Sequence, residues 1–362
     1  AETGKYRRLT LPARVGLAVL PRVTAVDMRL EDTPKGTWIG PTLQKAVAAR
    51  LEREEQSLLF LNRRGYAPVT LCRACGHQMG CPTCDARLVE HRFMRRLMCH
   101  QCGESFPIPH ACPDCGGEGR MAPVGPGVER LSEEVAAIFP TARVAVLSSD
   151  LFGSARSLKD AIESIAEGGA DIVIGTQLVA KGHNFPKLTL AGVVDADLGL
   201  YGSDLRAAER TFALMRQVAG RAGRGDAPGE ALLQTYRPDH AVIQAILSGD
   251  DEGFWRAELD ARRLASMPPF TRLAGVIVSG EDAQGVMDKA VELSRATAPL
   301  RAIGAEIWGP APAPVARVRG RHRVRLLVKA ERGAPLQEAL AQWTGAVALP
   351  GEDGRPTGAL LG

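Results

Sequence analysis

Long apolar runs and a secretory leader are both missing from this 362-residue sequence. No stretch approaches the ~18 apolar residues that a bilayer-spanning helix needs. The first residues, AETGKYRRLTLPARVGLAVL, contain a six-residue apolar core, which is too short for a secretory signal. An excess of one charge sign is also missing, because 45 Lys and Arg stand against 41 Asp and Glu, and the net charge of +4 permits a polyanionic partner without demanding one. We therefore expect a cytoplasmic protein with no membrane partner.

Cysteine is absent from most of the chain and concentrated in one segment, as four C-x-x-C pairs with the sequences CRAC, CPTC, CHQC and CPDC. Each pair bends the backbone so that two thiolates converge, and two pairs complete a tetrahedral Zn(Cys)₄ site. A reducing cytoplasm disfavours disulfides, and a thioredoxin-type motif has one such pair, whereas an iron–sulfur cluster would accept the same four donors. We predict two zinc ions, held by Cys72, Cys75, Cys81, Cys84, Cys99, Cys102, Cys112 and Cys115.

The loop lengths predict how the pairs combine. Five residues separate Cys75 from Cys81, which is tight for a chain that must fold back, whereas fourteen separate Cys84 from Cys99, close to zinc-ribbon spacing. The second and third pairs therefore share one ion, and the first and fourth pairs share the other in a nested arrangement. Because protein supplies all four ligands, neither ion has an open position, and its role is folding rather than chemistry.

A basic segment, EHRFMRRLMCHQC, lies inside the nest. Its basic residues alternate with apolar ones: His91, Arg92, Arg95, Arg96 and His100 stand among Phe93, Met94, Leu97 and Met98. Such a face suits contact with a phosphate backbone or a single strand, and it equally suits a solvated hairpin. Both interpretations stay open.

Strands alternating with helices predict the fold class. Apolar strands such as DIVIGT and LTLAGVVDAD alternate with helical segments such as SDLRAAERTFALMRQVAG, which is typical of a parallel sheet with helices on both faces. Ligands bind at the carboxyl ends of such strands. We expect the informative segments at that edge: GTQLVAKGHNF after one strand, DADLGLYGSD after another, and QVAGRAGR at the end of a helix. From about residue 267 the pattern changes to a small α+β domain.

QVAGRAGR, residues 217–224, places two arginines three positions apart among small residues. As helix C-terminal cations, Arg221 and Arg224 could complement the helix dipole. The intervening glycines, however, let a ligand approach the backbone closely, and two guanidinium forks suit a phosphate chain.

Three segments together resemble a known family. QVAGRAGR resembles motif VI of superfamily 2 helicases, DIVIGTQLVAKGHNFP resembles motif V, and LLFLNRRGYAP resembles motif IV. With four C-x-x-C pairs directly after that last strand, the order resembles the family of primosomal protein N′, the PriA replication-restart helicases. The resemblance implies a RecA-like second helicase lobe with an inserted double zinc-ribbon module and a C-terminal α+β domain.

The resemblance also implies roles for particular residues. Gln217 would position the attacking water or the γ-phosphate, and Arg221 and Arg224 would act as arginine fingers. Nucleotide state would be coupled to the DNA strand by Thr176, Gln177, Lys181 and Gly182. Asp195 and Asp197 would hold the loop network or the nucleotide, with a helix cap near Ser203 and Asp204 as the alternative.

Cofactors and partners follow from the same resemblance: two structural Zn²⁺, ATP with Mg²⁺ in the full-length protein, forked and single-stranded DNA, single-stranded DNA-binding protein and other primosome proteins. The family's C-terminal domain helps to bind branched DNA. Five arginines of one parity, Arg317, Arg319, Arg321, Arg323 and Arg325, would form one cationic stripe if they lay on a regular strand. A charged edge strand that resists aggregation is the alternative.

Neither G-x-x-x-x-G-K-[ST] nor D-E-x-H occurs in the sequence, so the arginines have no phosphate loop to face. One hypothesis is a portion of an ATP-dependent 3′ to 5′ helicase, inactive by itself, and Ala at position 1 favours it. The other is a catalytically inactive, zinc-stabilised module for DNA binding and primosome assembly. We expect the end of a first lobe and a linker helix at 1–57, the second lobe at 58–68 and 122–237, the zinc insertion at 69–121, a helical connector at 238–266, and the C-terminal DNA-binding domain at 267–362.

Overall fold

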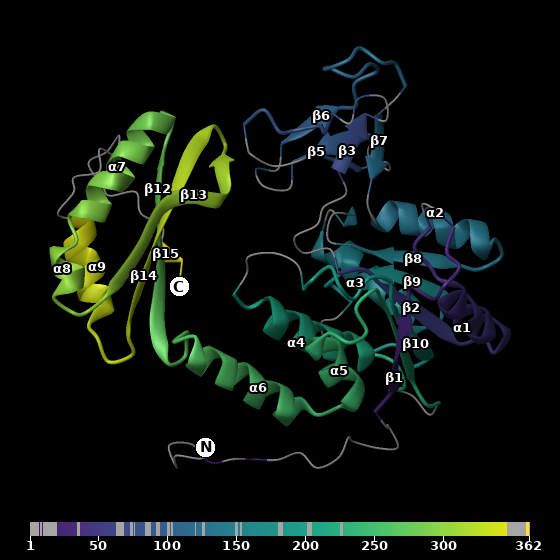
Figure 1. Ribbon diagram of the computed structural model, residues 1–362. Helices are drawn as coiled ribbons and strands as arrows, with labels where there is room; N and C mark the ends of the chain where they lie inside the picture. Colours follow the sequence, from purple (N-terminus) through teal and green to yellow (C-terminus); the bar gives the residue numbers. More distant parts are fainter. Residues whose placement is uncertain are drawn as a thin grey trace. The chain divides into compact units, whose positions relative to one another are not determined.

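The computed structural model describes most of the chain in two compact units. Unit 1 comprises residues 1–67 and 126–251, and unit 2 comprises 68–125 and 252–362 (Figure 1). The described residues are 7, 9, 20–34, 37–62, 69–72, 75, 77–83, 88–91, 95–99, 102, 104–119, 121–124, 127–148, 151–152, 154–179, 184–200, 205–224, 227–345 and 360–361. Within these residues, no helix has the length and apolar character needed to cross a membrane.

Unit 1 is built on a six-stranded sheet in the order β1-β11-β10-β2-β9-β8, and every neighbouring pair is parallel. The strands are β1 (Arg22–Asp27), β2 (Gln56–Phe60), β8 (Val144–Leu147), β9 (Ile172–Gly175), β10 (Leu188–Val193) and β11 (Glu230–Thr235). The central strands β2, β9 and β10 are buried at every residue, as expected of a parallel sheet covered on both faces. The predicted α/β class is confirmed.

Helices cover this sheet. On one face, α1 (Pro41–Glu52) and α2 (Val128–Ile138) bury Leu43 and Leu131 against Leu59 of β2 and Ile174 of β9. Figure 1 shows α4 (Ala207–Ala219) and α5 (Ala241–Ser248) on the other side, where they contact β10, β11 and β1. A further helix, α3 (Ala155–Ala166), is capped by Ser154, whose hydroxyl oxygen accepts the Ser157 N–H.

The first strand and helix join this same sheet. The sequence predicts the end of a first lobe and a linker helix at residues 1–57. In the structure β1 pairs with β11 along its whole length, and α1 packs on β2 and β10. Hydrophobic periodicity identifies a strand but not the sheet that it joins, because pairing partners are distant in sequence. The other expected domain boundaries stay predictions.

The cysteine segment of unit 2 forms two small antiparallel sheets. One pairs β3 (Val69–Cys72) with β7 (Met121–Val124), and the other contains β4 (Val89–His91), β5 (Arg96–Met98) and β6 (Ser105–Pro107). Their small core consists of Leu88 and Leu97 with Cys81 and Cys99. We call residues 69–121 the cysteine module.

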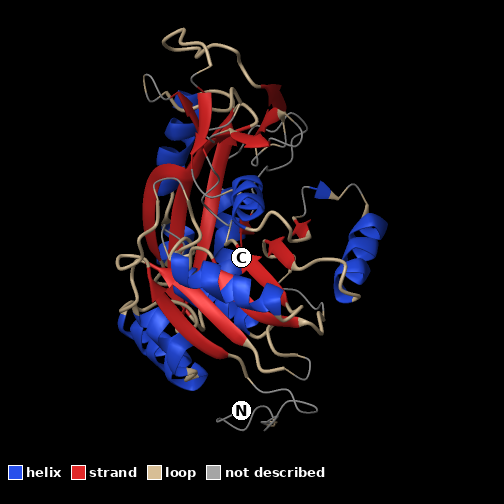
Figure 2. Ribbon diagram, turned by 90° about the vertical axis from the view of Figure 1, so that its right-hand side faces the viewer, coloured by secondary structure: helices blue, strands red, loops and turns tan. Residues whose placement is uncertain are grey.

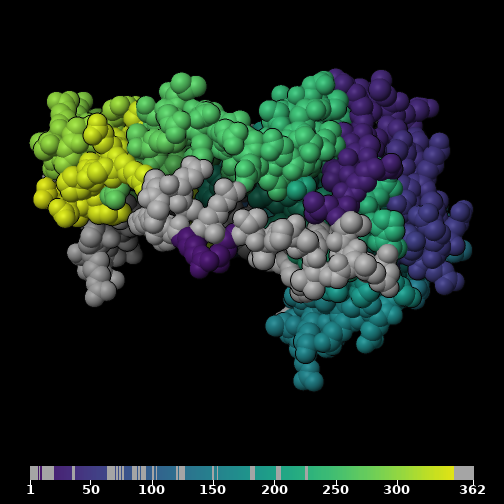
Figure 3. All heavy atoms as spheres, turned by 90° about the horizontal axis from the view of Figure 1, so that it is seen from below, coloured from purple at the N-terminus to yellow at the C-terminus, as the bar shows by residue number. Residues whose placement is uncertain are grey.

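The C-terminal part of unit 2 is an antiparallel sheet with helices packed on one face, as Figure 2 shows in red and blue. Its strands are β12 (Thr271–Gly280), β13 (Glu306–Val318), β14 (Arg321–Glu331) and β15 (Leu360–Leu361), and its helices are α7 (Ala283–Arg295), α8 (Ala298–Arg301) and α9 (Leu336–Gly345). Alternate residues of β14, Val324, Leu326 and Val328, are buried against α7 and α9. The predicted α+β fold is confirmed. Helix α6 (Asp251–Leu264) precedes the first strand of this domain. In the space-filling view of Figure 3, the part of the chain that contains α6 is coloured green.

Candidate functional site

The arginine-rich segment forms a turn at the amino edge of the unit 1 sheet. Helix α4 ends at Ala219, and Gly223, with φ +71°, donates its N–H to the carbonyl of Leu188 at the start of β10 (2.9 Å). A Cβ on Gly223 would overlap the backbone nitrogen of Gly229, whose carbonyl accepts the N–H of Arg22 at the start of β1. Gly223 and Gly229 are therefore packed together beside the first residues of β10, β11 and β1.

This position corrects the expectation that the informative segments lie together at the carboxyl edge. A helix that connects two parallel strands runs antiparallel to them, so its end lies at the edge where the next strand begins. The run 217–224 ends such a helix, whereas Thr176 and Asp197 follow strands. The structure thus separates these residues onto two edges of one sheet.

The three predicted catalytic residues differ in exposure. Gln217 is exposed on the last turn of α4, and Arg224 is exposed with its Nε donating to the Gly220 carbonyl (3.0 Å). Arg221 is only 6% exposed. Burial, and then the charge of Arg224, lower the pKa of the Arg221 guanidinium. Two cations thus lie close together in this turn, one of them buried and one exposed.

Thr176 and Gln177 begin the connection from β9 to β10. Thr176 is buried at the carboxyl end of β9, and its carbonyl accepts the N–H of Val179 (3.1 Å). The connection ends at the opposite edge, where the Lys187 carbonyl accepts the N–H of Gln56 (2.8 Å) and Leu188 contacts the arginine turn. The segment 176–187 therefore joins the two edges. Lys181 and Gly182 lie outside the described residues.

Asp195 and Asp197 hold the carboxyl end of β10. Asp195 Oδ1 accepts the N–H groups of Asp197 (2.9 Å) and Leu198 (3.1 Å), and burial raises the pKa of the Asp195 carboxyl. Asp197 is buried and accepts from the Thr235 hydroxyl (2.5 Å) and the Tyr236 N–H (2.7 Å) at the end of β11. Both carboxylates thus accept hydrogen bonds at the carboxyl ends of β10 and β11. The alternative cap at Ser203 and Asp204 lies outside the described residues.

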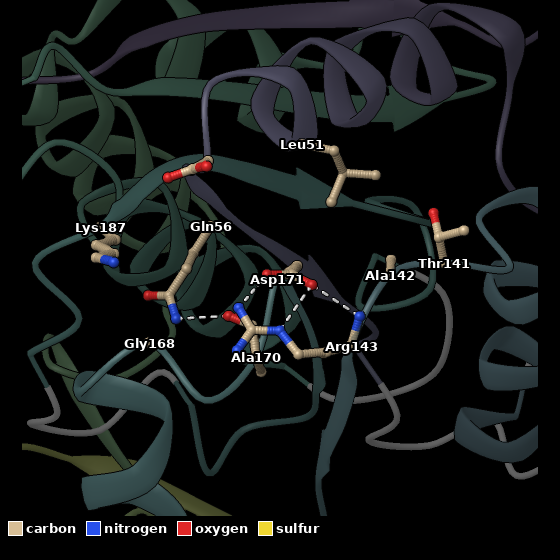
Figure 4. A pocket seen from close by; sticks show the side chains of 10 residues that line it. Leu51, Gln56, Thr141, Ala142, Arg143, Gly168, Ala170, Asp171 and Lys187 are labelled. Carbon is tan, nitrogen blue, oxygen red and sulfur yellow. Dashed lines mark hydrogen bonds and ion pairs between the residues drawn. The ribbon is translucent and has the colours of Figure 1, made fainter.

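Sequence reasoning missed a polar pocket at the amino edge. It has a volume of about 430 Å³ and is lined by ten residues, among them Gln56, Arg143, Asp171 and Lys187 (Figure 4). Arg143 donates to both carboxylate oxygens of Asp171 at 3.1 and 2.5 Å, and these bonds lower the pKa of Asp171. The residues come from four turns that are distant in sequence, so no local pattern identifies them.

One group of cysteines closes the base of the module. Cys72, Cys75, Cys112 and Cys115 place their sulfur atoms within 4.8 Å of one another, and the Cys72–Cys115 and Cys75–Cys112 pairs are both 3.7 Å apart. Zinc–sulfur bonds of about 2.3 Å in a tetrahedron place the sulfurs about 3.8 Å apart. Gly116, directly after Cys115, has φ +72°, a left-handed backbone conformation that glycine adopts without steric cost. We call this the outer group.

A second group lies within the first. The Sγ atoms of Cys81, Cys99 and Cys102 lie within 4.8 Å of one another, and Cys81–Cys102 is 3.8 Å. We call these three residues the inner group; the predicted fourth ligand, Cys84, lies outside the described residues. The grouping is the nested one that the loop lengths predict. Both donor sets consist of thiols at tetrahedral spacing, so they fit zinc.

The two basic segments are only partly as expected. On β5, Arg96 is exposed and bonds to Ser105, while Leu97 is buried, which agrees with the predicted alternation. Arg92 and His100 lie outside the described residues. The expected single arginine stripe is wrong, because Arg319 and Gly320 have positive φ and form a turn between β13 and β14.

That turn divides the five arginines. Arg321, Arg323 and Arg325 share one face of β14, opposite the buried Val324. Arg317 lies on β13 and pairs with His322, so it takes the other face. A spacing of two residues predicts a shared face only within one strand, and it does not reveal a turn of two residues between two strands.

Two protein-family models match the chain: the PriA DNA helicase Cys-rich region at residues 81–107 and the primosomal protein N C-terminal domain at 263–353. The replication restart protein PriA of Rickettsia conorii is 40% identical over 96% of the chain, which covers 53% of that protein. PriA of Bacillus subtilis is 38% identical over 94% of the chain and 42% of that protein. The chain is thus similar to PriA along nearly its whole length and spans about half the length of these relatives.

Solved helicase structures give only weak likenesses. Dbp5 of S. cerevisiae bound to RNA and ADP BeF3 is 14% identical with a TM-score of 0.28, covering 62% of this chain and 42% of that one. The Hef helicase domain of Pyrococcus furiosus is 12% identical with a TM-score of 0.26, covering 60% and 27%. At these scores the strand order, rather than the likeness, identifies the fold.

Proposed function

We propose that this chain is a portion of an ATP-dependent 3′ to 5′ DNA helicase that recognises stalled forks and starts primosome assembly in replication restart. It would supply the second helicase lobe, the zinc-binding module and the C-terminal DNA-binding domain. The observation that carries the proposal is the 40% identity to replication restart protein PriA over 96% of the chain. Nothing in the comparisons favours the alternative of a binding module without turnover.

The arginine turn fits the role of a phosphate sensor in such an enzyme. Arg221 and Arg224 would contact the phosphates of ATP, where a guanidinium stabilises charge that develops on the transferred phosphoryl oxygens. Gln217 would orient the attacking water from the same turn. The phosphate loop and the acidic residues that hold Mg²⁺ would come from a first lobe, because the chain has neither motif.

The segment 176–187 would couple the nucleotide to the DNA strand. It begins at Thr176 on one edge of the sheet and ends beside Leu188, whose carbonyl holds the arginine turn. A displacement of the turn would therefore reach the connection directly. Thr176, Gln177, Lys181 and Gly182 would contact DNA or nucleotide along it, while Asp197 would support it.

Each cysteine group would hold one Zn²⁺ with no open coordination position. Such an ion supplies folding free energy and no chemistry. DNA would contact the basic faces of the module and of β14, with forked and single-stranded DNA as the substrates. Single-stranded DNA-binding protein and other primosome proteins would be its partners in the cytoplasm.

The test of the catalytic role is ATP hydrolysis by the full-length protein in the presence of forked DNA. Arg221→Ala is expected to lower kcat by about 10³-fold or more, because an arginine finger contributes that much. Arg210→Ala, at an exposed position on the same helix, is the matched control and should leave kcat within about twofold. Equal activity of both variants would refute the assignment.

The isolated chain tests the binding role. It should not hydrolyse ATP, and it should bind forked DNA with an affinity that falls steeply as salt rises. ATP turnover by the chain alone, abolished by Arg221→Ala, would show that a phosphate loop exists within these 362 residues. Absence of DNA binding at low salt would contradict the DNA-binding role.

A further inference from the structure

The β13–β14 hairpin ends in a two-residue turn in which one backbone N–H takes no part in the pairing of the two strands. Val318 pairs with Arg321, and the intervening Arg319 (φ 50°) and Gly320 (φ +78°) both take the left-handed conformation of a type I′ turn. In such a turn the strand ladder does not use the N–H of the second turn residue. The Gly320 N–H instead donates to the carbonyl of Thr83 in the cysteine module, at 2.6 Å.

The acceptor is fixed by the inner group. Thr83 follows Cys81 by two positions, and its hydroxyl lies 3.4 Å from Cys81 Sγ and 3.9 Å from Cys102 Sγ. The same hydroxyl donates to Glu104 (3.1 Å), whose carbonyl accepts the N–H of Cys99. The position of the Thr83 carbonyl therefore depends on the arrangement of all three described inner cysteines.

An apolar contact accompanies this hydrogen bond. Val318, the last residue of β13, packs against the core of the cysteine module, which contains Cys81, Leu88, Leu97 and Cys99. The cysteine module and the C-terminal domain, separated by more than one hundred residues of sequence, form one compact unit. The hairpin tip, residues 317–321, thus meets the module through both a hydrogen bond and a partly buried apolar side chain.

The inner group has few other means of holding this shape. Among the described residues, its cluster has two buried aliphatic side chains, Leu88 and Leu97, together with Cys81 and Cys99, while Met79, Phe106 and Ile108 pack against it partly buried. A core of this size does not fold by burial alone, so bound metal has to supply the folding free energy. The Thr83 carbonyl would then be placed for Gly320 only while the metal is bound.

We infer that the inner group, when it holds its metal, is the docking site of the hairpin tip, so that metal binding and docking of the C-terminal domain stabilise each other. The inference rests on the proposed metal occupancy of the inner group. Coupling between two binding events is reciprocal, so the effect has to be visible from both directions. The outer group, whose described sulfur contacts are with one another, serves as the comparison and should show no such coupling.

The first experiment is hydrogen exchange of the Gly320 amide in the full chain loaded with zinc. Cys102→Ser, in the inner group, should raise its exchange rate about tenfold, since the amide loses a hydrogen bond of ordinary strength. Cys115→Ser, in the outer group, is the matched control and should leave the rate within about twofold. Equal rates in the two variants, whether both raised or both unchanged, would overturn the inference.

The reciprocal experiment changes the hairpin and measures the metal. Val318→Ser should leave two ions bound in native mass spectrometry but raise the rate of zinc loss from one of them to a competing chelator several-fold. Val315→Ser, on the same strand before the tip, is the control and should leave that rate unchanged. An unaltered rate in Val318→Ser would overturn the coupling.

The ion count distinguishes the two levels of the proposal. One ion per chain, with Gly320 still protected, would contradict the inner metal site itself and the inference with it. Two ions, with an unprotected Gly320 amide, would leave the metal assignment intact and refute docking alone. Both results are independent of ATP hydrolysis.

Discussion

The parallel sheet of unit 1 and the cysteine module of unit 2 are folded by different forces. Strands β2, β9 and β10 are buried at every position, and helices cover them with leucine, isoleucine and valine. The module has strands of three or four residues and a core with two buried leucines. Burial of apolar area stabilises the first region, whereas thiol ligands are needed for the second. The two regions should therefore fail under different treatments.

Removal of metal gives the largest expected difference. Structural zinc contributes about 10–16 kcal/mol of apparent binding free energy at a four-ligand site. A strong chelator should unfold residues 69–121 and leave the parallel sheet formed, as measured by hydrogen exchange along the chain. Simultaneous loss of protection in β2 and β10 would mean that the two regions are not independent.

A cavity in the sheet should give the opposite result. Leu59 of β2 is fully buried in the core that includes Leu43 of α1. Leu59→Ala should lower the free energy of unfolding of unit 1 by about 2–5 kcal/mol. The content of bound zinc should stay at two ions. Leu30→Ala, at a position 85% exposed, is the control for the loss of a leucine without a cavity. If a chelator lowered the melting temperature of the sheet in the Leu59→Ala variant, the sheet and the cysteine module would not be stabilised independently.

Two glycines of unit 1 distinguish the cost of a left-handed backbone from the cost of lost packing. Gly223 and Gly249 have φ +71° and +69°, but an added Cβ would overlap the Gly229 backbone at the first and would meet open space at the second. Gly249→Ala should cost about 1–2 kcal/mol for the left-handed conformation alone. Gly223→Ala should cost more and should also displace the arginine turn. Chemical denaturation of both variants measures the difference, and equal values would show that the turn is not packed as described.

The smallest effect concerns Asp195. Burial raises the pKa of its carboxyl in the folded chain, so the group favours folding while protonated, and this contribution is lost as the pH rises through the folded pKa. Asp195→Asn keeps an Oδ1 acceptor for both backbone N–H groups. It should change stability at neutral pH by no more than about 1 kcal/mol and flatten the pH profile. Asp239→Asn, at an exposed position, should preserve the slope of the native protein.

The sequence predicted features that local patterns encode and missed those that depend on direction or on distant pairing. Strand and helix alternation predicted the parallel sheet, and loop lengths predicted the nested cysteine groups. The alternation of strands and helices does not indicate at which edge of the sheet a helix ends. The expectation of the arginine turn at the carboxyl edge is therefore wrong, and the turn lies at the amino edge. A two-residue turn at Arg319 and Gly320 divides the five arginines that the sequence spacing assigned to one face. The pocket at Arg143 and Asp171 combines four distant turns, which no single segment reveals.

Because the cysteine groups are nested, synthesis of the chain completes the inner group before the outer one. Chains emerge from the ribosome from the amino end, and segments fold as they become available. Cys102 emerges before Cys112 and Cys115, so the inner group can take up its metal while the outer group still lacks half of its ligands. Gly320 emerges much later. The newly made hairpin would therefore meet a site that is already loaded and shaped, and in a cell short of zinc the hairpin would lack its docking site.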